Sequence, residues 1–148
     1  MWVSEPAEIV REMTRVTKPG GKVIAFAEPD YGGRIDFPDQ LAILTDFQIE
    51  SLKQQGADPF MGRKLAEIFW DAELTSIRTG VLGSEWSGNP DWKAWESEWD
   101  VFESDLSFLN SSLSTDELNS LKEIDRQAHS KGYRVLFVPT FYAMGFVD

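Results

Sequence analysis

Apolar side chains recur every three or four residues in five stretches of the chain, which is the spacing of one face of a helix. The pattern predicts helices over residues 4–17, 39–55, 63–72, 90–108 and 114–131. Between them, a continuous apolar run at 23–27 and an alternating run at 76–82 indicate strands, and a strand-rich tail covers 133–147. Pro139 predicts a bend or a bulge in that tail. The predicted order is helix, strand, two helices, strand, two helices and a final strand.

The first predicted helix and strand have a definite burial pattern. The apolar residues that mark one face of the helix are Ile9, Val10, Met13 and Val16. The strand that follows, from Val23 to Ala27, is apolar without interruption, which is typical of a strand covered on both faces in a parallel sheet. Pro19, Gly20 and Gly21 separate the two elements, because proline does not continue a helix and glycine takes positive φ.

The helix predicted over 90–108 carries an aromatic seam. Its apolar residues are Trp92, Trp95, Trp99, Phe102, Leu106 and Leu109. Such a seam is usually core, but it could also form an aromatic pocket or a lid for an apolar substrate. Asn89 and Pro90 indicate the start of this helix, and Ser114 with Glu117 indicates a capping box for the next one. The single histidine, His129, is expected on the surface.

The composition fits one domain covering residues 1–148. The chain has 25 acidic and 14 basic side chains, and its formal net charge of −11 disfavours nucleic acid and anionic membranes as partners. Cysteine is absent, which excludes disulfides and thiolate metal sites, and we expect no bound metal. No apolar run is long enough to span a bilayer and no signal peptide is recognisable, so we expect a cytoplasmic location.

One segment resembles a known family. Residues 11–22 read Arg-Glu-Met-Thr-Arg-Val-Thr-Lys-Pro-Gly-Gly-Lys and lead through the apolar strand into Glu28, Pro29 and Asp30. A helix that ends in Arg-Val-x-Lys-Pro-Gly-Gly before a buried strand resembles the second half of class I methyltransferases (methyltransferase type 11), which use S-adenosylmethionine (SAM). The resemblance continues at 56–59, 62–65 and 134–138.

The resemblance implies an α/β fold, namely a partial Rossmann-like methyltransferase sheet with added helices. The strands at 23–27 and 76–82 would be strands five and six of the family, and the tail from 134 to about 147 would be strand seven. In the family, a glycine-rich turn near strands one to four holds SAM, and this sequence has no G-x-G-x-x-G or G-x-G-x-G spacing. Trp2 falls where strand four ends, which makes it the candidate for cofactor contact. We expect the substrate-side half of the fold, inactive alone.

The candidate substrate-binding residues lie around the carboxyl end of the first strand, where ligands bind in such sheets. Glu28 and Asp30 could orient substrate or act as a base, or Asp30 could cap local amides. Tyr31 could line a substrate pocket. Arg63 could bind an anion near a helix N-terminus, or pair with a carboxylate. Trp86 completes the set, and no catalytic residue is identified.

A half sheet of this kind has a physical consequence at its edge. Without a strand four, the run from Val23 to Ala27 presents unpaired backbone N–H and C=O groups, and the first helix loses neighbours. We expect a homo-oligomer, most simply a twofold dimer through this strand edge, or association with a separate chain that supplies the missing N-terminal half.

Three functions stay open at this point. The first is part of a SAM-dependent methyltransferase that acts on a small molecule. The alternative is a non-catalytic small-molecule-binding or oligomerising interaction module that uses the Trp-rich helix. The third is a structural remnant that folds and oligomerises without a ligand.

Overall fold

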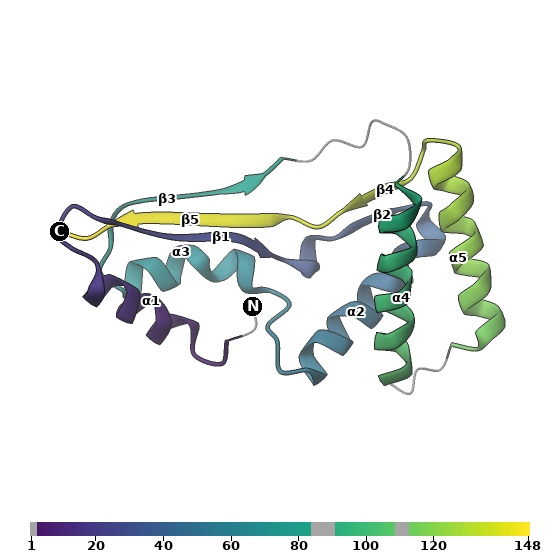
Figure 1. The fold of residues 1–148 in the computed structure, drawn as a ribbon, viewed down its shortest axis with the longest axis horizontal. Coiled ribbons are helices and arrows are strands. Elements are labelled where there is room, and N and C mark those ends of the chain that lie inside the picture. Colours follow the sequence, from purple (N-terminus) through teal and green to yellow (C-terminus); the bar gives the residue numbers. More distant parts are fainter. Residues whose placement is uncertain (1–2, 84–90, 109–112) are drawn as a thin grey trace. The chain divides into compact units, whose positions relative to one another are not determined.

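The computed structural model describes residues 3–83, 91–108 and 113–148, and its main elements follow the predicted order (Figure 1). The helices are α1 (Pro6–Val16), α2 (Ile43–Gln54), α3 (Met61–Asp71), α4 (Trp92–Phe108) and α5 (Thr115–Ser130), with 3-10 helices η1 (Tyr31–Gly33) and η2 (Asp39–Ala42). The strands are β1 (Lys22–Pro29), β2 (Ile35–Phe37), β3 (Thr75–Leu82), β4 (Val135–Phe137) and β5 (Thr140–Phe146). No helix in these ranges is long and apolar enough to cross a membrane.

The chain folds into two compact units that interleave along the sequence. The first unit contains Met1–Gly33, Gly56–Gly83 and Val138–Asp148, and the second contains Arg34–Gln55 and Ser84–Phe137. Each unit has its own hydrophobic core. The prediction of a single domain did not anticipate this division.

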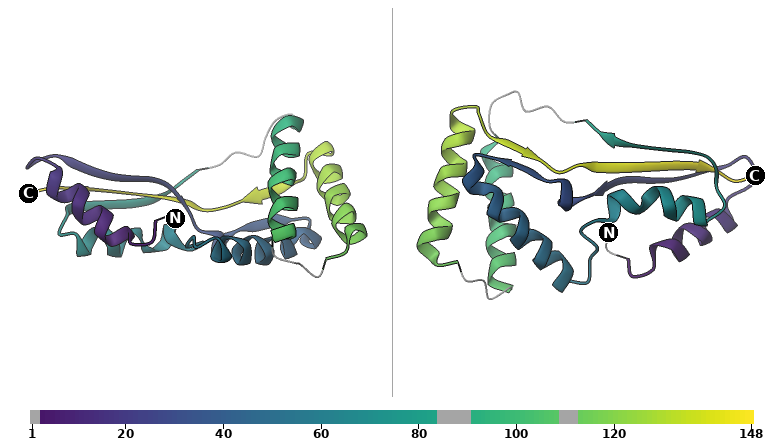
Figure 2. Two further views of the ribbon diagram at one scale, coloured as in Figure 1. Left: turned by 60° about the horizontal axis from the view of Figure 1, so that its bottom comes forward. Right: turned by 180° about the vertical axis from the view of Figure 1, so that it is seen from behind.

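The first unit is a three-stranded sheet with helices on one face. β5 is the central strand, with β1 on one side and β3 on the other (Figure 1). Both pairs are antiparallel, so β1 and β3 run parallel to each other. α1 and α3 lie on the same side of this sheet (Figure 2). The buried residues between helices and sheet are Val10, Val23, Met61, Leu65, Ile68, Phe69, Ala72, Leu74 and Ala143.

β1 is not covered on both faces, and the prediction of a strand inside a parallel sheet is wrong. Val23 is buried against the helices, whereas Ile24 and Phe26 keep 49% and 67% of their surface exposed. Successive side chains of a strand point to opposite faces. The continuous apolar run therefore gives β1 two apolar faces, and the described residues of the first unit cover one of them.

The apolar face of α1 is only partly buried, which also corrects the expectation from the sequence. Val10 lies in the core, but Ile9, Met13 and Val16 are exposed. The helical spacing predicted the helix correctly. It could not tell whether another element covers each apolar position, and nothing described in the first unit covers these three.

The second unit is built around α4. Trp95, Trp99, Phe102 and Leu106 are buried together with Leu41 and Leu44. The ring centroids of Trp95 and Trp99 lie 6.2 Å apart, and those of Trp99 and Phe102 lie 5.7 Å apart. The structure therefore shows the core interpretation for these four residues of the seam, whereas Trp92 keeps 40% of its surface exposed and Leu109 lies outside the described residues. A two-stranded antiparallel sheet, β2 with β4, completes the secondary structure described here.

Helix caps define both long helices of the second unit. The Oδ1 atom of Asp91 accepts from the amides of Lys93 and Ala94 at 3.1 Å each, at the start of α4. The predicted start at 89–90 lies outside the described residues. The capping box of α5, with Ser114 and Glu117, is confirmed, because both of its reciprocal hydrogen bonds are present.

Candidate functional site

The loop after β1 contains a buried carboxylate, that of Asp30, which keeps 2% of its surface exposed. Its Oδ2 accepts from Nε of Arg63 at 2.5 Å and its Oδ1 from Nη2 of Arg63 at 2.7 Å, so the ion pair is bidentate. The same carboxylate accepts from the backbone amides of Arg63 and Gly32, at 3.2 Å and 3.1 Å. These bonds tie the end of β1 to the first turn of α3.

Two glycines permit this close approach. A Cβ atom on Gly32 would lie 2.5 Å from Nη2 of Arg63. A Cβ atom on Gly62 would lie 2.5 Å from the ring of Phe141 and 2.9 Å from the backbone oxygen of Glu28. Any larger residue at either position would force the loop and the start of α3 apart. The resemblance at 62–65 thus contains a residue with a clear packing reason to be glycine.

Arg63 pairs with a nearby carboxylate, which is one of its two predicted roles. The hydrogen bond and then the charge of Asp30 raise the pKa of Arg63 above its usual value. Its side chain keeps 55% of its surface exposed, and its Cζ atom lies 5.3 Å from the centroid of the Phe60 ring. Arg63 is therefore a fixed cation that still faces solvent, and anion binding by it stays a prediction.

The other described members of the predicted site lie in this loop or directly before it. Asp30 accepts the amide of Gly32, as the capping interpretation expected. The amide of Tyr31 donates to the backbone oxygen of Pro59 at 2.8 Å, which fixes η1 against the segment before α3. Glu28 lies two residues before Asp30, in β1. The last two predicted residues, Trp2 and Trp86, lie outside the described residues.

A groove of about 500 Å³ lies between α1, α3 and β1. Apolar side chains form most of its lining, among them Ile9, Met13 and Leu65 from the helices and Phe26 from the strand. Glu28 is the one charged residue among the described residues that line it. The groove can therefore hold an apolar group beside a single carboxylate.

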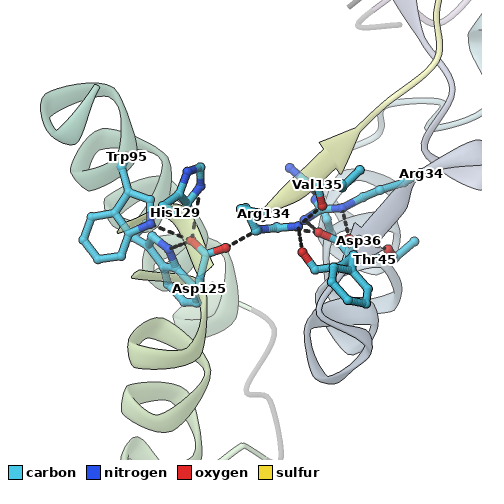
Figure 3. A network of polar contacts seen from close by, with 11 residues as sticks. Arg34, Asp36, Thr45, Trp95, Asp125, His129, Arg134 and Val135 are labelled. Carbon is cyan, nitrogen blue, oxygen red and sulfur yellow. Dashed lines mark hydrogen bonds and ion pairs between the residues drawn. The ribbon is translucent and has the colours of Figure 1, made fainter. Parts of the chain in front are cut away.

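The second unit contains a buried polar network that the sequence analysis did not predict (Figure 3). Asp36, with none of its side-chain surface exposed, accepts from Nε of Arg34 at 2.6 Å and from Nη2 of Arg134 at 2.6 Å. Thr45 Oγ1 donates to the same carboxylate at 3.2 Å. Two buried guanidinium groups therefore share this carboxylate.

Asp125 forms the other half of this network. Its Oδ2 atom accepts from the indole nitrogens of Trp95 and Trp99, at 2.6 Å and 2.9 Å, and its Oδ1 accepts from Nε of Arg134 (Figure 3). His129 lies on the same helix with Nε2 3.9 Å from Oδ2 of Asp125. Its side chain keeps 30% of its surface exposed, so His129 is half-buried and meets the predicted surface position only in part.

The network shifts the protonation of its members in different directions. Burial alone would raise the pKa of Asp36, but the hydrogen bonds and charges of Arg34 and Arg134 hold that pKa below its usual value. Burial lowers the pKa of His129, the charge of Asp125 opposes this, and Arg134 adds to the lowering. Partial burial and then the charge of Asp125 raise the pKa of Glu98.

We expect the second unit to lose stability as the pH falls below about 6.5, the usual pKa of histidine. Because the folded state lowers the pKa of His129, the unfolded chain takes up this proton more readily, and acid favours unfolding. His129→Gln removes this titration. Urea unfolding between pH of about 8 and 5 measures the effect. In that range the free energy of unfolding should fall more steeply with falling pH for the wild type than for His129→Gln. An equal pH dependence of the two proteins would contradict the expectation.

The network has little spare capacity for a ligand. No buried side-chain nitrogen or oxygen atom in the described parts of the chain lacks a hydrogen-bond partner. Those parts also contain no cluster of three side chains suited to a metal ion. The network is therefore a structural feature of the second unit. The groove of the first unit, in contrast, offers an unfilled surface.

One signal in the sequence could have found part of this network. Asp125 lies four residues after Leu121 and three before Ala128, so it falls on the apolar face of its predicted helix. A carboxylate on such a face needs a buried partner. The partners Asp36 and Arg134 are 98 residues apart and have no local pattern that links them.

No protein-family model matches the chain, and no curated protein is significantly similar to it in sequence.

Proposed function

We propose that the first unit forms the substrate-side part of a SAM-dependent methyltransferase that acts on a small molecule. The observation that carries this proposal is the sheet. The three strands that the resemblance equates with strands five, six and seven lie in one sheet, with β5 between β1 and β3. β1 and β3 are parallel and α3 between them packs on the sheet, which supports an α/β arrangement.

The loop after β1 supports a ligand site at that end of the sheet. Ligands of open α/β sheets bind outside the carboxyl ends of the strands. Here the bidentate pair of Asp30 and Arg63 fixes the loop, and Asp30 acts as a positioning residue. We assign Glu28 to the methyl acceptor, whose hydroxyl or amine would donate a hydrogen bond to it, while the groove holds the apolar part. Tyr31 and Arg63 are the other residues that we propose for contact with the acceptor.

The groove suits such an acceptor better than SAM. SAM carries an ammonium, a carboxylate, a sulfonium and ribose hydroxyls, and these groups need several charged or polar partners. Glu28 is the single charged residue in the described lining. We propose that SAM is held by residues other than these, and we derive no methyl-transfer step from the first unit alone. We also propose that another polypeptide extends the sheet at β1.

Calorimetric titration of the 148-residue chain with SAM tests the cofactor part of the proposal. We expect no binding at micromolar concentrations, because the described groove offers the charged groups of SAM one carboxylate. Micromolar binding of SAM by the isolated chain would overturn the assignment of a substrate-side part.

A matched pair of ligands tests the acceptor part and separates it from a non-catalytic binding module. An alkylphenol should bind more tightly than the alkylbenzene of equal size, and nuclear magnetic resonance titration measures both affinities. Glu28→Gln should reduce this preference by about tenfold, because a charge-assisted hydrogen bond becomes a neutral one. Glu67→Gln, the same change on the exposed side of α3, serves as the control. Equal binding of both ligands would favour the non-catalytic module.

A further inference from the structure

We infer that a second copy of this chain pairs with the outer edge of β1, antiparallel and in a twofold register centred on Ile24. The inference rests on the part of the proposed function that extends the sheet at β1, and it names the polypeptide that extends it. It does not depend on methyl transfer.

The edge of β1 has the features of a pairing surface. β1 is an edge strand, and no strand described in the first unit pairs with its outer side. Ile24 and Phe26 are exposed, although each is a large apolar residue. A row of unpaired backbone groups beside exposed apolar side chains is a template for another strand. The opposite edge, β3, is less apolar, because Val81 is its one exposed large apolar side chain, against Ile24 and Phe26 of β1.

The surface next to this edge is apolar as well. Ile9 and Met13 of α1 are exposed and line the groove that runs along β1. Val16 is exposed one turn further along α1, so Ile9, Met13 and Val16 together form an exposed apolar stripe on this helix. A strand added to β1 would close the groove on the sheet side, and an element that follows that strand would cover the stripe. The exposed stripe and the exposed edge thus describe one continuous docking surface.

The charge distribution favours a second copy over a basic partner. The chain has a net charge of −11, so two copies repel each other over most of their surface. Residues 3–33, which contain α1 and β1, carry four basic and five acidic side chains and are close to neutral. Two copies can meet there without that repulsion. A strongly basic partner would instead be drawn to the more acidic remainder of the chain.

The geometry of β1 sets the register. A bulge at Ala27, where φ is 63°, shifts the pairing of β1 with β5 between Ala25 and Glu28 and ends the regular edge. The regular part therefore covers Lys22 to Ala25, and Ile24 is the one large apolar side chain in it that is exposed, so we place the twofold axis there.

A twofold axis through Ile24 makes this edge complementary to itself. Ile24 then lies opposite the partner's Ile24, and Val23 lies opposite the partner's Ala25. Apolar pairs directly opposite each other are favourable across strands. The axis is perpendicular to the sheet, so both copies of α1 lie on the same face and cover each other's exposed stripe.

The mass in solution is the first test. Light scattering should give twice the 16.8 kDa of one chain. Ile24→Lys places two like charges opposite each other, and it should raise the dissociation constant by about tenfold or more. Because Ile24 is exposed on the open face, circular dichroism should show an unchanged fold. A wild-type monomer, or a dimer that Ile24→Lys leaves intact, would overturn the inference.

A cysteine cross-link tests the register. The natural chain has no cysteine, so Ile24→Cys introduces a single thiol that faces its own copy across the axis. Mild oxidation should convert most of this variant to a covalent dimer on a non-reducing gel. Arg78→Cys, an equally exposed thiol on the other edge strand, should stay monomeric on that gel. Equal cross-linking of the two variants would contradict the register.

The outcomes separate this inference from the proposed function. A monomeric chain that still shows the alkylphenol preference would overturn the second copy and leave the acceptor site standing. A cross-linked dimer that binds SAM at micromolar concentration would overturn the substrate-side assignment and leave the dimer standing.

Discussion

We expect Asp36→Asn to lower the free energy of unfolding of the second unit by about 3–5 kcal/mol. The carboxylate of Asp36 is fully buried and accepts from Arg34 and Arg134, whose side chains are also nearly buried. Asparagine keeps the shape of the side chain but removes its charge. Two buried guanidinium groups then lose the carboxylate that they share, although Arg134 keeps its pair with Asp125, and the unfolded state solvates both groups better.

Urea unfolding followed by tryptophan fluorescence measures this effect, because Trp95 and Trp99 lie in the core of the same unit. Asp46→Asn makes the same chemical change on the exposed side of α2 and should alter stability by less than about 0.5 kcal/mol. The folded state lowers the pKa of Asp36, so its contribution is present at neutral pH and is lost as the pH falls. The difference between wild type and variant should therefore narrow below pH of about 4. If Asp36→Asn lowered the free energy of unfolding at neutral pH no more than Asp46→Asn does, the network would not stabilise the second unit.

The second large effect is expected from Phe69→Ala, at about 3–5 kcal/mol of the free energy of unfolding of the first unit. Phe69 has none of its surface exposed and is the largest fully buried side chain among the described residues. It lies on α3 in the core between that helix and the sheet. Alanine would leave a cavity that the packed side chains around it can fill only in part.

Trp70→Ala is the matched control for Phe69→Ala. The neighbouring ring is also aromatic and lies on the same helix, but it keeps 75% of its surface exposed. Its loss should change the free energy of unfolding by less than about 0.5 kcal/mol. Amide hydrogen exchange should place the destabilisation by Phe69→Ala in β1, β3, β5 and α3. An equal effect of the two variants would mean that the first unit has no tightly packed core.

The positions of helices and strands could be predicted from the sequence because each depends on neighbouring residues. The steps of three and four from Trp92 to Leu106 define α4, and Ser114 with Glu117 defines the start of α5. The short strands β2 and β4 escaped a separate prediction, because three residues are too few for a period. Helices and strands that are long enough to show a period could therefore be predicted, and only their first and last residues differ from the prediction.

Burial and ion pairing could be predicted much less well, because both depend on residues far away in the sequence. The apolar residues Ile24 and Met13 look like core in the sequence, and the structure leaves them exposed. The pair of Asp30 and Arg63 joins two predicted site residues that are 33 positions apart, and its ion-pair alternative was foreseen. The ion pair of Asp36 and Arg134 joins residues that no pattern connects.

The central position of β5 has a consequence for how the protein is made. β1 and β3 do not pair with each other, and each pairs with β5, which comes after both in the sequence. β5 begins at Thr140, 118 positions after β1 begins at Lys22, so both outer strands leave the ribosome before the strand that joins them. The first unit therefore has to wait with two unpaired apolar strands until β5 has been synthesised. The net charge of −11 would help to keep the chain soluble during that interval.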